Sequence, residues 1–124
     1  MTAGPATGDL LSAVVTLLGG ISDSVRILPA TVPIGDMIDQ LRGARPEMTP
    51  EMTLVLAGPD LTAIDRAMLL AAMGPLAIEL APARRIGVLD IADGAAAAEI
   101  AAAARFLIEA GSTTGQTLRI EAVS

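Results

Sequence analysis

The chain has 124 residues, a net charge of −6 and 52% apolar residues, which indicates one folded domain and excludes a disordered protein. It contains no His, Cys, Lys, Tyr, Trp or Asn, so it lacks the side chains that most often act as general base, thiolate nucleophile, Schiff-base amine or phenolic acid. Eight arginines scattered among fourteen carboxylates, with Phe106 as the single aromatic residue, argue against nucleic-acid binding.

The N-terminal part of the sequence predicts a flexible start, a helix and a strand. Residues 1–8 are rich in Gly, Pro and Thr, and residues 9–19 are typical of a short helix with Asp9 as its N-cap. The β-type residues from Ser24 to Val32 predict the first strand, which Pro33 ends.

Two strand–helix pairs are predicted in the middle of the chain. Residues 34–44 have the apolar spacing of one helix face, formed by Ile34, Met37, Ile38 and Leu41. Residues 52–57 form a short apolar run, as expected for a strand that is buried on both faces. Asp60 or Thr62 then caps a long helix that reaches about Leu80.

The C-terminal part completes an alternating pattern. Residues 85–91 predict a strand, residues 94–109 an alanine-rich helix that Asp93 caps, and residues 116–123 the last strand. Regular alternation of strands and helices calls for parallel pairing with right-handed helical crossovers. The predicted fold class is therefore α/β, with three layers and a four-stranded, mostly parallel sheet flanked by helices.

No segment predicts export or membrane insertion. The longest apolar run, from Ala67 to Ile78, contains Gly74 and Pro75 and is shorter than the ~18 residues that cross a bilayer. No basic residue precedes the apolar stretch of residues 10–18, as a signal peptide would require. We therefore expect a cytoplasmic protein that does not bind membranes.

Asp90 and Asp93 lie at the predicted carboxyl end of a parallel strand, where open α/β sheets bind ligands. Their oxygens could hold Mg²⁺, but carboxylates this close together are more common in a loop that ends in a helix cap. Asp60 and Asp65, on either side of Thr62, predict a solvated charge cluster with the adjacent Arg66. We predict no metal-binding residue.

Two stretches of the C-terminal half carry a family resemblance. PLAIELAPARRIGVLDI, residues 75–91, and RFLIEAGSTTGQTLRI, residues 105–120, are similar to consecutive segments of the short-chain dehydrogenases/reductases (SDR family). The resemblance is strongest from about residue 60 onwards. It implies that residues 1–124 form a single truncated Rossmann-like domain, which corresponds to the second half of the family fold.

The same register places Thr62 and Arg66 where the family carries its YxxxK active-site pair. A threonine hydroxyl lacks the acidity of a phenol, and Arg66 has no tyrosine to activate. The family's glycine-rich TGxxxGxG turn also has no counterpart, because Gly19 and Gly20 follow a helix rather than a strand. The resemblance therefore implies a relative with no catalytic residue, no cofactor-binding residue and no cofactor.

The helix predicted over residues 62–80 has apolar residues on almost all sides, so one stripe that faces the sheet does not account for them. In the family, this helix packs against its counterpart across a two-fold axis. We therefore predict a homodimer, or a heteromer with an active SDR-family protein, in which adaptable apolar side chains make the contacts. The candidate interface residues are Met68, Leu69, Leu70, Ala72 and Met73.

Three functional hypotheses follow. The first is a non-catalytic SDR-like scaffold or regulatory subunit that acts through the hydrophobic helix. The second is a small, divergent NAD(P)-dependent oxidoreductase, which rests on analogy with the family fold. The third is an α/β ligand-binding or assembly module that is unrelated to the family. The absent Tyr and Lys favour the first hypothesis.

Overall fold

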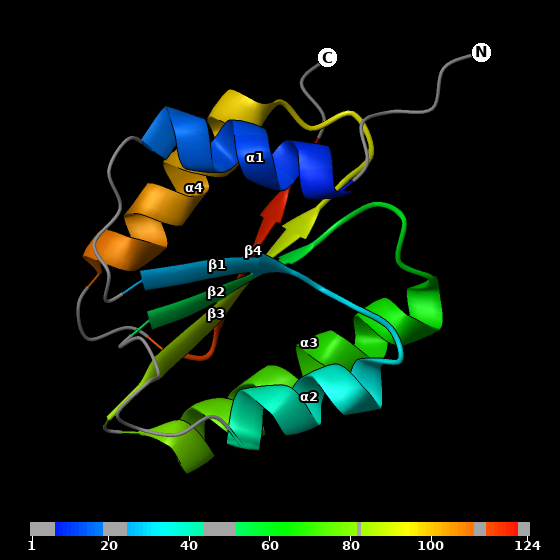
Figure 1. Ribbon diagram of the computed structural model, residues 1–124, viewed down its shortest axis with the longest axis vertical. Coiled ribbons are helices and arrows are strands. Elements are labelled where there is room, and N and C mark those ends of the chain that lie inside the picture. Colours follow the sequence, from blue (N-terminus) through cyan, green and yellow to red (C-terminus); the bar gives the residue numbers. More distant parts are fainter. Residues whose placement is uncertain (1–6, 19–24, 44–51, 82, 111–113, 122–124) are drawn as a thin grey trace.

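The computed structural model describes residues 7–18, 25–43, 52–81, 83–110 and 114–121. Helices and strands alternate along these residues after an initial helix, as the sequence predicts (Figure 1). The elements are α1 (Thr7–Leu18), β1 (Val25–Pro29), α2 (Ile34–Gly43), β2 (Met52–Ala57), α3 (Ala63–Leu80), β3 (Arg85–Ile91), α4 (Ala97–Glu109) and β4 (Gln116–Ile120).

The four strands form one parallel sheet in the order β1-β2-β3-β4. Helices α1 and α4 cover one face of this sheet, and α2 and α3 cover the other (Figure 1). The predicted three-layer α/β class is confirmed. The two inner strands, β2 and β3, are buried over almost their whole length because helices cover both of their faces.

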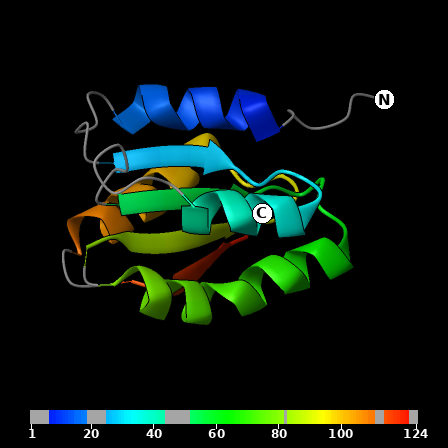
Figure 2. The same ribbon diagram turned by 60° about the horizontal axis from the view of Figure 1, so that its bottom comes forward.

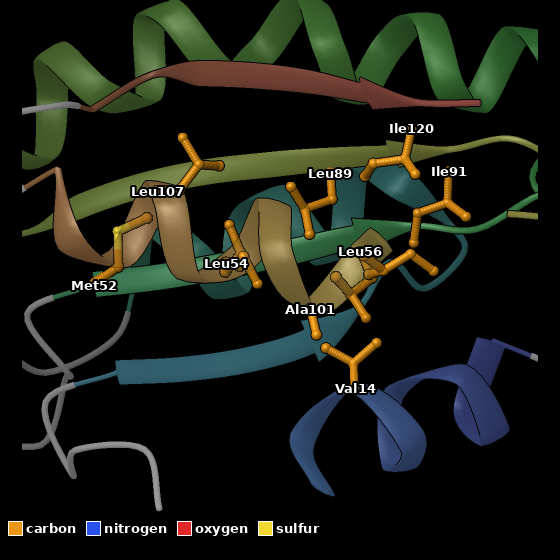
Figure 3. Close-up of a cluster of buried hydrophobic side chains, with 11 residues drawn as sticks. Val14, Met52, Leu54, Leu56, Leu89, Ile91, Ala101, Leu107 and Ile120 are labelled. Atoms are coloured by element: carbon orange, nitrogen blue, oxygen red, sulfur yellow. The ribbon is translucent and has the colours of Figure 1, made fainter. Parts of the chain in front are cut away.

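Alternate residues of the inner strands enter two separate cores. On the α1 and α4 face, Met52, Leu54 and Leu56 of β2 pack with Leu89 and Ile91 of β3 (Figure 3). Small residues of α4 allow this helix to lie close to the sheet, and Val14 of α1 completes the core. The members of this first core from α4 are Ile100, Ala101, Ala104 and Leu107.

The second core lies between the sheet and the pair α2 and α3. Val55 of β2 and Val88 of β3 point to this face, as the two-residue period of a strand requires. Helices α2 and α3 lie along this face of the sheet (Figure 2). Both helices bury apolar side chains against these strand residues. These buried helix residues are Ile34, Met37, Leu69, Met73, Leu76, Ala77 and Leu80.

The crossovers do not all have the hand that the sequence predicts. The sheet grows in one direction from β1 to β4, so crossovers of a single hand would place α2, α3 and α4 on the same face. Helix α4 instead lies on the opposite face from α2 and α3. With right-handed crossovers through α2 and α3, the connection β3–α4–β4 is left-handed, and the prediction of uniformly right-handed crossovers is wrong.

Several predicted boundaries also require correction. The first strand ends at Pro29 rather than Val32, because proline removes a donor and the chain then turns toward α2. Helix α4 begins at Ala97, three residues after the predicted start, and its N-cap Ala96 has no side-chain hydrogen bond. Asp9 lies inside α1 rather than at its cap. None of the described helices is long and apolar enough to cross a membrane.

Candidate functional site

Polar side chains from three elements meet at the carboxyl edge of the sheet. Arg66 comes from the first turns of α3, Asp90 from β3 and Arg119 from β4. Asp90 is opposite Arg119 in the register of β3 and β4. The Asp90 side chain lies on the sheet face that α3 covers, where it contacts Arg66. This carboxyl-edge cluster lies where open α/β sheets commonly bind their ligands.

Thr62 is the N-cap of α3. Its backbone is extended, with φ −67° and ψ 161°, and its Oγ1 accepts a hydrogen bond of 3.1 Å from the backbone N–H of Asp65. Threonine is a favoured N-cap because its hydroxyl satisfies a backbone donor that has no partner inside the helix. Of the two predicted caps, Asp60 and Thr62, the structure therefore has Thr62.

The guanidinium of Arg66 holds together the ends of two strands. Its Nη1 donates to Asp90 Oδ1 at 2.5 Å and to the carbonyl oxygen of Ala57 at 3.2 Å, and its Nη2 donates to the carbonyl oxygen of Gly58 at 2.7 Å. Only 18% of the Arg66 side chain and 11% of the Asp90 side chain are exposed. Arg66 thus satisfies the carbonyls of the last residue of β2 and of the residue after it, and it neutralises an acid in β3.

Arg119 extends the cluster to the outer strand. Its Nη1 donates to the same Asp90 Oδ1 at 3.0 Å, and its Nε donates to Glu121 Oε1 at 3.0 Å. Two hydrogen bonds raise the pKa of Arg119 above its ordinary value. The bond to Glu121 has the largest effect, and the bond to Asp90 has the next largest. Two cations and two carboxylates therefore balance one another at this edge.

The chemistry available to the carboxyl-edge cluster is limited. An arginine guanidinium stays protonated throughout the physiological pH range, so it serves poorly as a proton donor or acceptor. The Thr62 hydroxyl is engaged as a cap, because it accepts the hydrogen bond from the Asp65 N–H. The arrangement of Arg66, Asp90 and Arg119 supplies positioning and charge balance.

The two predicted candidates for a metal ligand are not brought together around a cation. Asp90 is buried in β3 and paired with two guanidinium groups, whereas Asp93 is exposed in the turn after the strand. Across the described ranges, no three acidic side chains gather in a way that could hold a metal ion. A divalent cation would need further carboxylates beside Asp90. The groups that lie there are instead the positively charged side chains of Arg66 and Arg119.

The candidate interface residues of α3 divide between the core and the surface. Leu69 and Met73 are 0% and 1% exposed and belong to the second core, so these two are not available to a partner in this conformation. Leu70 and Ala72 are half-buried at the margins, and Met68 is 48% exposed. The predicted interface is therefore revised to the exposed side of the helix.

That exposed side is apolar along its length. Ile64 and Ile78 are 74% and 80% exposed, and they are separated by about 21 Å at the 1.5 Å rise of an α-helix. Small residues lie between them on the same side. We call this set the outer face of α3: Ile64, Ala67, Met68, Ala71, Gly74, Pro75 and Ile78.

Sequence reasoning missed the pairing of Asp90 with Arg66 and Arg119. A signal was present, because Ile86, Val88 and Asp90 alternate onto one face of a strand that is buried on both faces. An acid on such a face needs a cation nearby. Thr114 Oγ1 accepts a 3.0 Å hydrogen bond from the Ile86 N–H and so connects the residue before β4 to β3.

Comparison with known proteins identifies a family over most of these elements. The family model described as "SDR-like: Short chain dehydrogenase-like protein" matches residues 34–120, which include α2, α3, the inner strands and β4. No curated protein and no solved structure matches the chain significantly. Because the match covers well over half of the 124 residues, the chain belongs to the SDR-like family of short-chain dehydrogenase-like proteins.

Proposed function

We propose that this protein is a non-catalytic SDR-like scaffold or regulatory subunit, which associates with a second chain through the outer face of α3. The proposal rests on the structural roles of Thr62 and Arg66, which stand at the two positions that resemble the family's catalytic pair. Thr62 caps a helix, and Arg66 bonds two carbonyls and Asp90. Both side chains contribute to the stability of the fold.

The outer face of α3 supports association through that helix. Exposed Ile64, Met68 and Ile78 form a continuous apolar stripe with alanines and a glycine between them. Contiguous exposed apolar surface is uncommon on a soluble monomer, and small residues allow two helices to approach closely. A second copy of the chain offers the same stripe, so a two-fold homodimer buries both surfaces at once.

Light scattering coupled to size-exclusion chromatography tests the association. At micromolar concentration we expect a mass near twice the 12.5 kDa of one chain. A mass of 12.5 kDa throughout the concentration range would rule out the homodimer, and the remaining form of the proposal would be a heteromer with an active SDR-family protein. Mixing with such a protein, followed by the same measurement, would then decide between them.

The second hypothesis, a small NAD(P)-dependent oxidoreductase, takes its support from membership of the SDR-like family. It would require cofactor contacts other than the family's glycine-rich turn and Tyr–Lys pair. Titration of NAD(P)H fluorescence separates this hypothesis from the first. The third hypothesis, a module unrelated to the family, is excluded by the family match over residues 34–120.

A further inference from the structure

The outer face of α3 is arranged symmetrically about Ala71. Ile64 lies seven residues before Ala71 and Ile78 lies seven residues after it, which is close to two turns of the helix in each direction. Both isoleucines are mostly exposed, at 74% and 80%. Met68 and Gly74 are likewise placed three residues before and three residues after Ala71. The face therefore has the same spacing of residues in both directions along the helix.

This symmetry makes the outer face of α3 complementary to a second copy of itself. A two-fold axis through Ala71, perpendicular to the helix, places each residue before Ala71 opposite the residue that is equally far after Ala71 in the other copy. Ile64 of one copy then meets Ile78 of the other, and the long Met68 side chain meets Gly74, which has no side chain. Among the described residues, a Cβ at Gly74 would have nothing within 4 Å apart from its chain neighbours and the backbone of α3. There is thus room over Gly74 for a methionine of the second copy.

Met68 differs in exposure from the other methionines of the described residues. It is 48% exposed, whereas Met37, Met52 and Met73 are each 1% exposed. The chain contains no Cys, so no thiol of the protein competes with the methionine thioethers for a peroxide. A dissolved oxidant therefore reaches Met68 before it reaches the methionines of the two cores.

We propose that Met68 is an oxidation site that controls the pairing of α3 with a second copy, an inference that rests on the proposed function. The Met68 sulfur donates an electron pair to one oxygen of hydrogen peroxide, the S–O bond forms as the O–O bond breaks, and the second oxygen leaves as water with both protons. Methionine sulfoxide is polar, and in the dimer its oxygen would be buried against the apolar surface around Gly74. Oxidised chains are therefore monomers, and reduction of the sulfoxide restores the dimer.

Sedimentation velocity of the full chain before and after treatment with hydrogen peroxide tests the proposal. We expect the dimer dissociation constant to rise about tenfold or more once Met68 carries one oxygen atom. Tandem mass spectrometry of the tryptic peptide 67–84 follows Met68 and Met73 separately. Incubation with the two methionine sulfoxide reductases, one for each epimer at sulfur, should return the dissociation constant to its starting value.

The rate of oxidation provides a second readout. Because the dimer buries Met68, the rate constant for its oxidation should fall about fivefold or more as the protein concentration rises from well below to well above the dissociation constant. Peroxide is kept in excess, so that its own depletion does not slow the reaction. N-acetylmethionine in the same solution serves as the reference, and its oxidation rate should not change.

Two matched variants assign the effect to Met68. Met68→Leu has no sulfur at this position, so its dissociation constant should be the same with and without peroxide. Met73→Leu removes a methionine of the second core with little change in volume and keeps Met68, so peroxide should weaken its dimer as in the wild type. Both variants retain Met1 and Met48, which lie outside the described residues. Circular dichroism verifies that each variant is folded.

Three results would decide against the proposal in different ways. A wild-type dimer whose dissociation constant is unchanged after full oxidation of Met68 would overturn the oxidation control and leave the proposed function standing. Equal weakening of the Met68→Leu dimer by peroxide would show that another residue is responsible. A wild-type chain that is monomeric before any oxidant is added would instead rule out the homodimer itself.

Discussion

At the scale of the residue, Arg66 links the ends of β2 and β3 through its hydrogen bonds and its ion pair. It occupies the position that resembles the family's catalytic lysine, yet its guanidinium makes three hydrogen bonds inside the protein. A lysine ammonium is a point charge with a single nitrogen, so it cannot reach all three acceptors as the planar guanidinium does. The arginine therefore suits a structural role at this position.

Replacement of Arg66 tests that structural role. Arg66→Met should lower the free energy of unfolding by about 2 kcal/mol, because Asp90 keeps only Arg119 as a partner and two carbonyls lose a donor. The loss is smaller than for a fully enclosed pair because Arg119 remains. Urea unfolding followed by far-ultraviolet circular dichroism provides the measurement.

Arg42→Met is the matched control for Arg66→Met. Arg42 pairs with Glu79 at 3.0 Å, but both side chains are about half exposed, so its loss should cost less than about 0.5 kcal/mol. Equal effects of the two replacements would contradict the structural role of Arg66.

Gly115 provides a second prediction at this scale. Its φ is +74°, a Cβ at this position would lie 3.0 Å from Ala77 Cβ, and its N–H donates to Ile86 O at 2.7 Å. Gly115→Ala should therefore destabilise the fold by about 1–2 kcal/mol. Gly35→Ala, in open space within α2, should stabilise it by about 0.5 kcal/mol. Thermal unfolding of both variants checks the opposite signs, and a stabilising Gly115→Ala would refute the steric explanation.

Contacts between residues close in sequence can be predicted in this protein, whereas contacts between distant residues cannot. The Thr62 cap could be predicted because a cap depends on neighbours along the chain. The pair formed by Arg66 and Asp90 could not be located in the same way, because its partners are 24 residues apart and meet only when α3 packs on β3.

At the scale of the element, α3 shows how an apolar helix divides its surface. The sequence predicts its extent almost to the residue, because the cap and the apolar run are local signals. It does not show which apolar residues face the sheet, since apolar residues surround the helix and leave little amphipathic pattern. For that reason the predicted interface included Leu69 and Met73, which are buried in the second core.

Charge placed on the outer face of α3 tests association. Ile78→Glu should weaken the dimer at least tenfold, because a carboxylate would be buried against an apolar partner surface. The matched control is Phe106→Glu on α4, where the ring is 63% exposed outside this face, and it should leave the dimer unchanged. Sedimentation velocity across a concentration series gives both dissociation constants, and equal constants for Ile78→Glu and the wild type would exclude this face as the interface.

At the scale of the whole molecule, the function proposed here predicts a weak response to nicotinamide cofactors. NAD(P)H fluorescence should show no saturable change below about 100 µM, whereas an active short-chain dehydrogenase serves as the positive control. The chain has no Trp or Tyr, so its own emission does not interfere. A dissociation constant below 100 µM corresponds to about 5.5 kcal/mol of binding free energy and would favour the oxidoreductase hypothesis.

The layered architecture could be predicted for a physical reason, because alternating strands and helices have few ways to bury two faces of a parallel sheet. The left-handed crossover from β3 to β4 could not be predicted from the sequence, because parallel strands are generally joined by right-handed crossovers. Burial decides between the two arrangements, because α4 covers the face of β2 and β3 that α2 and α3 leave open.

The reversed hand of β3–α4–β4 makes the topology economical. A sheet that adds every strand on the same side with uniform chirality ends with all its crossover helices stacked on one surface, and the other surface stays bare. The left-handed connection β3–α4–β4 places a helix on that second surface and leaves the order of the strands unchanged. Gly94, whose φ is 87°, lies at the bend where the chain leaves β3 for the far side, and it allows the backbone to make this change of direction.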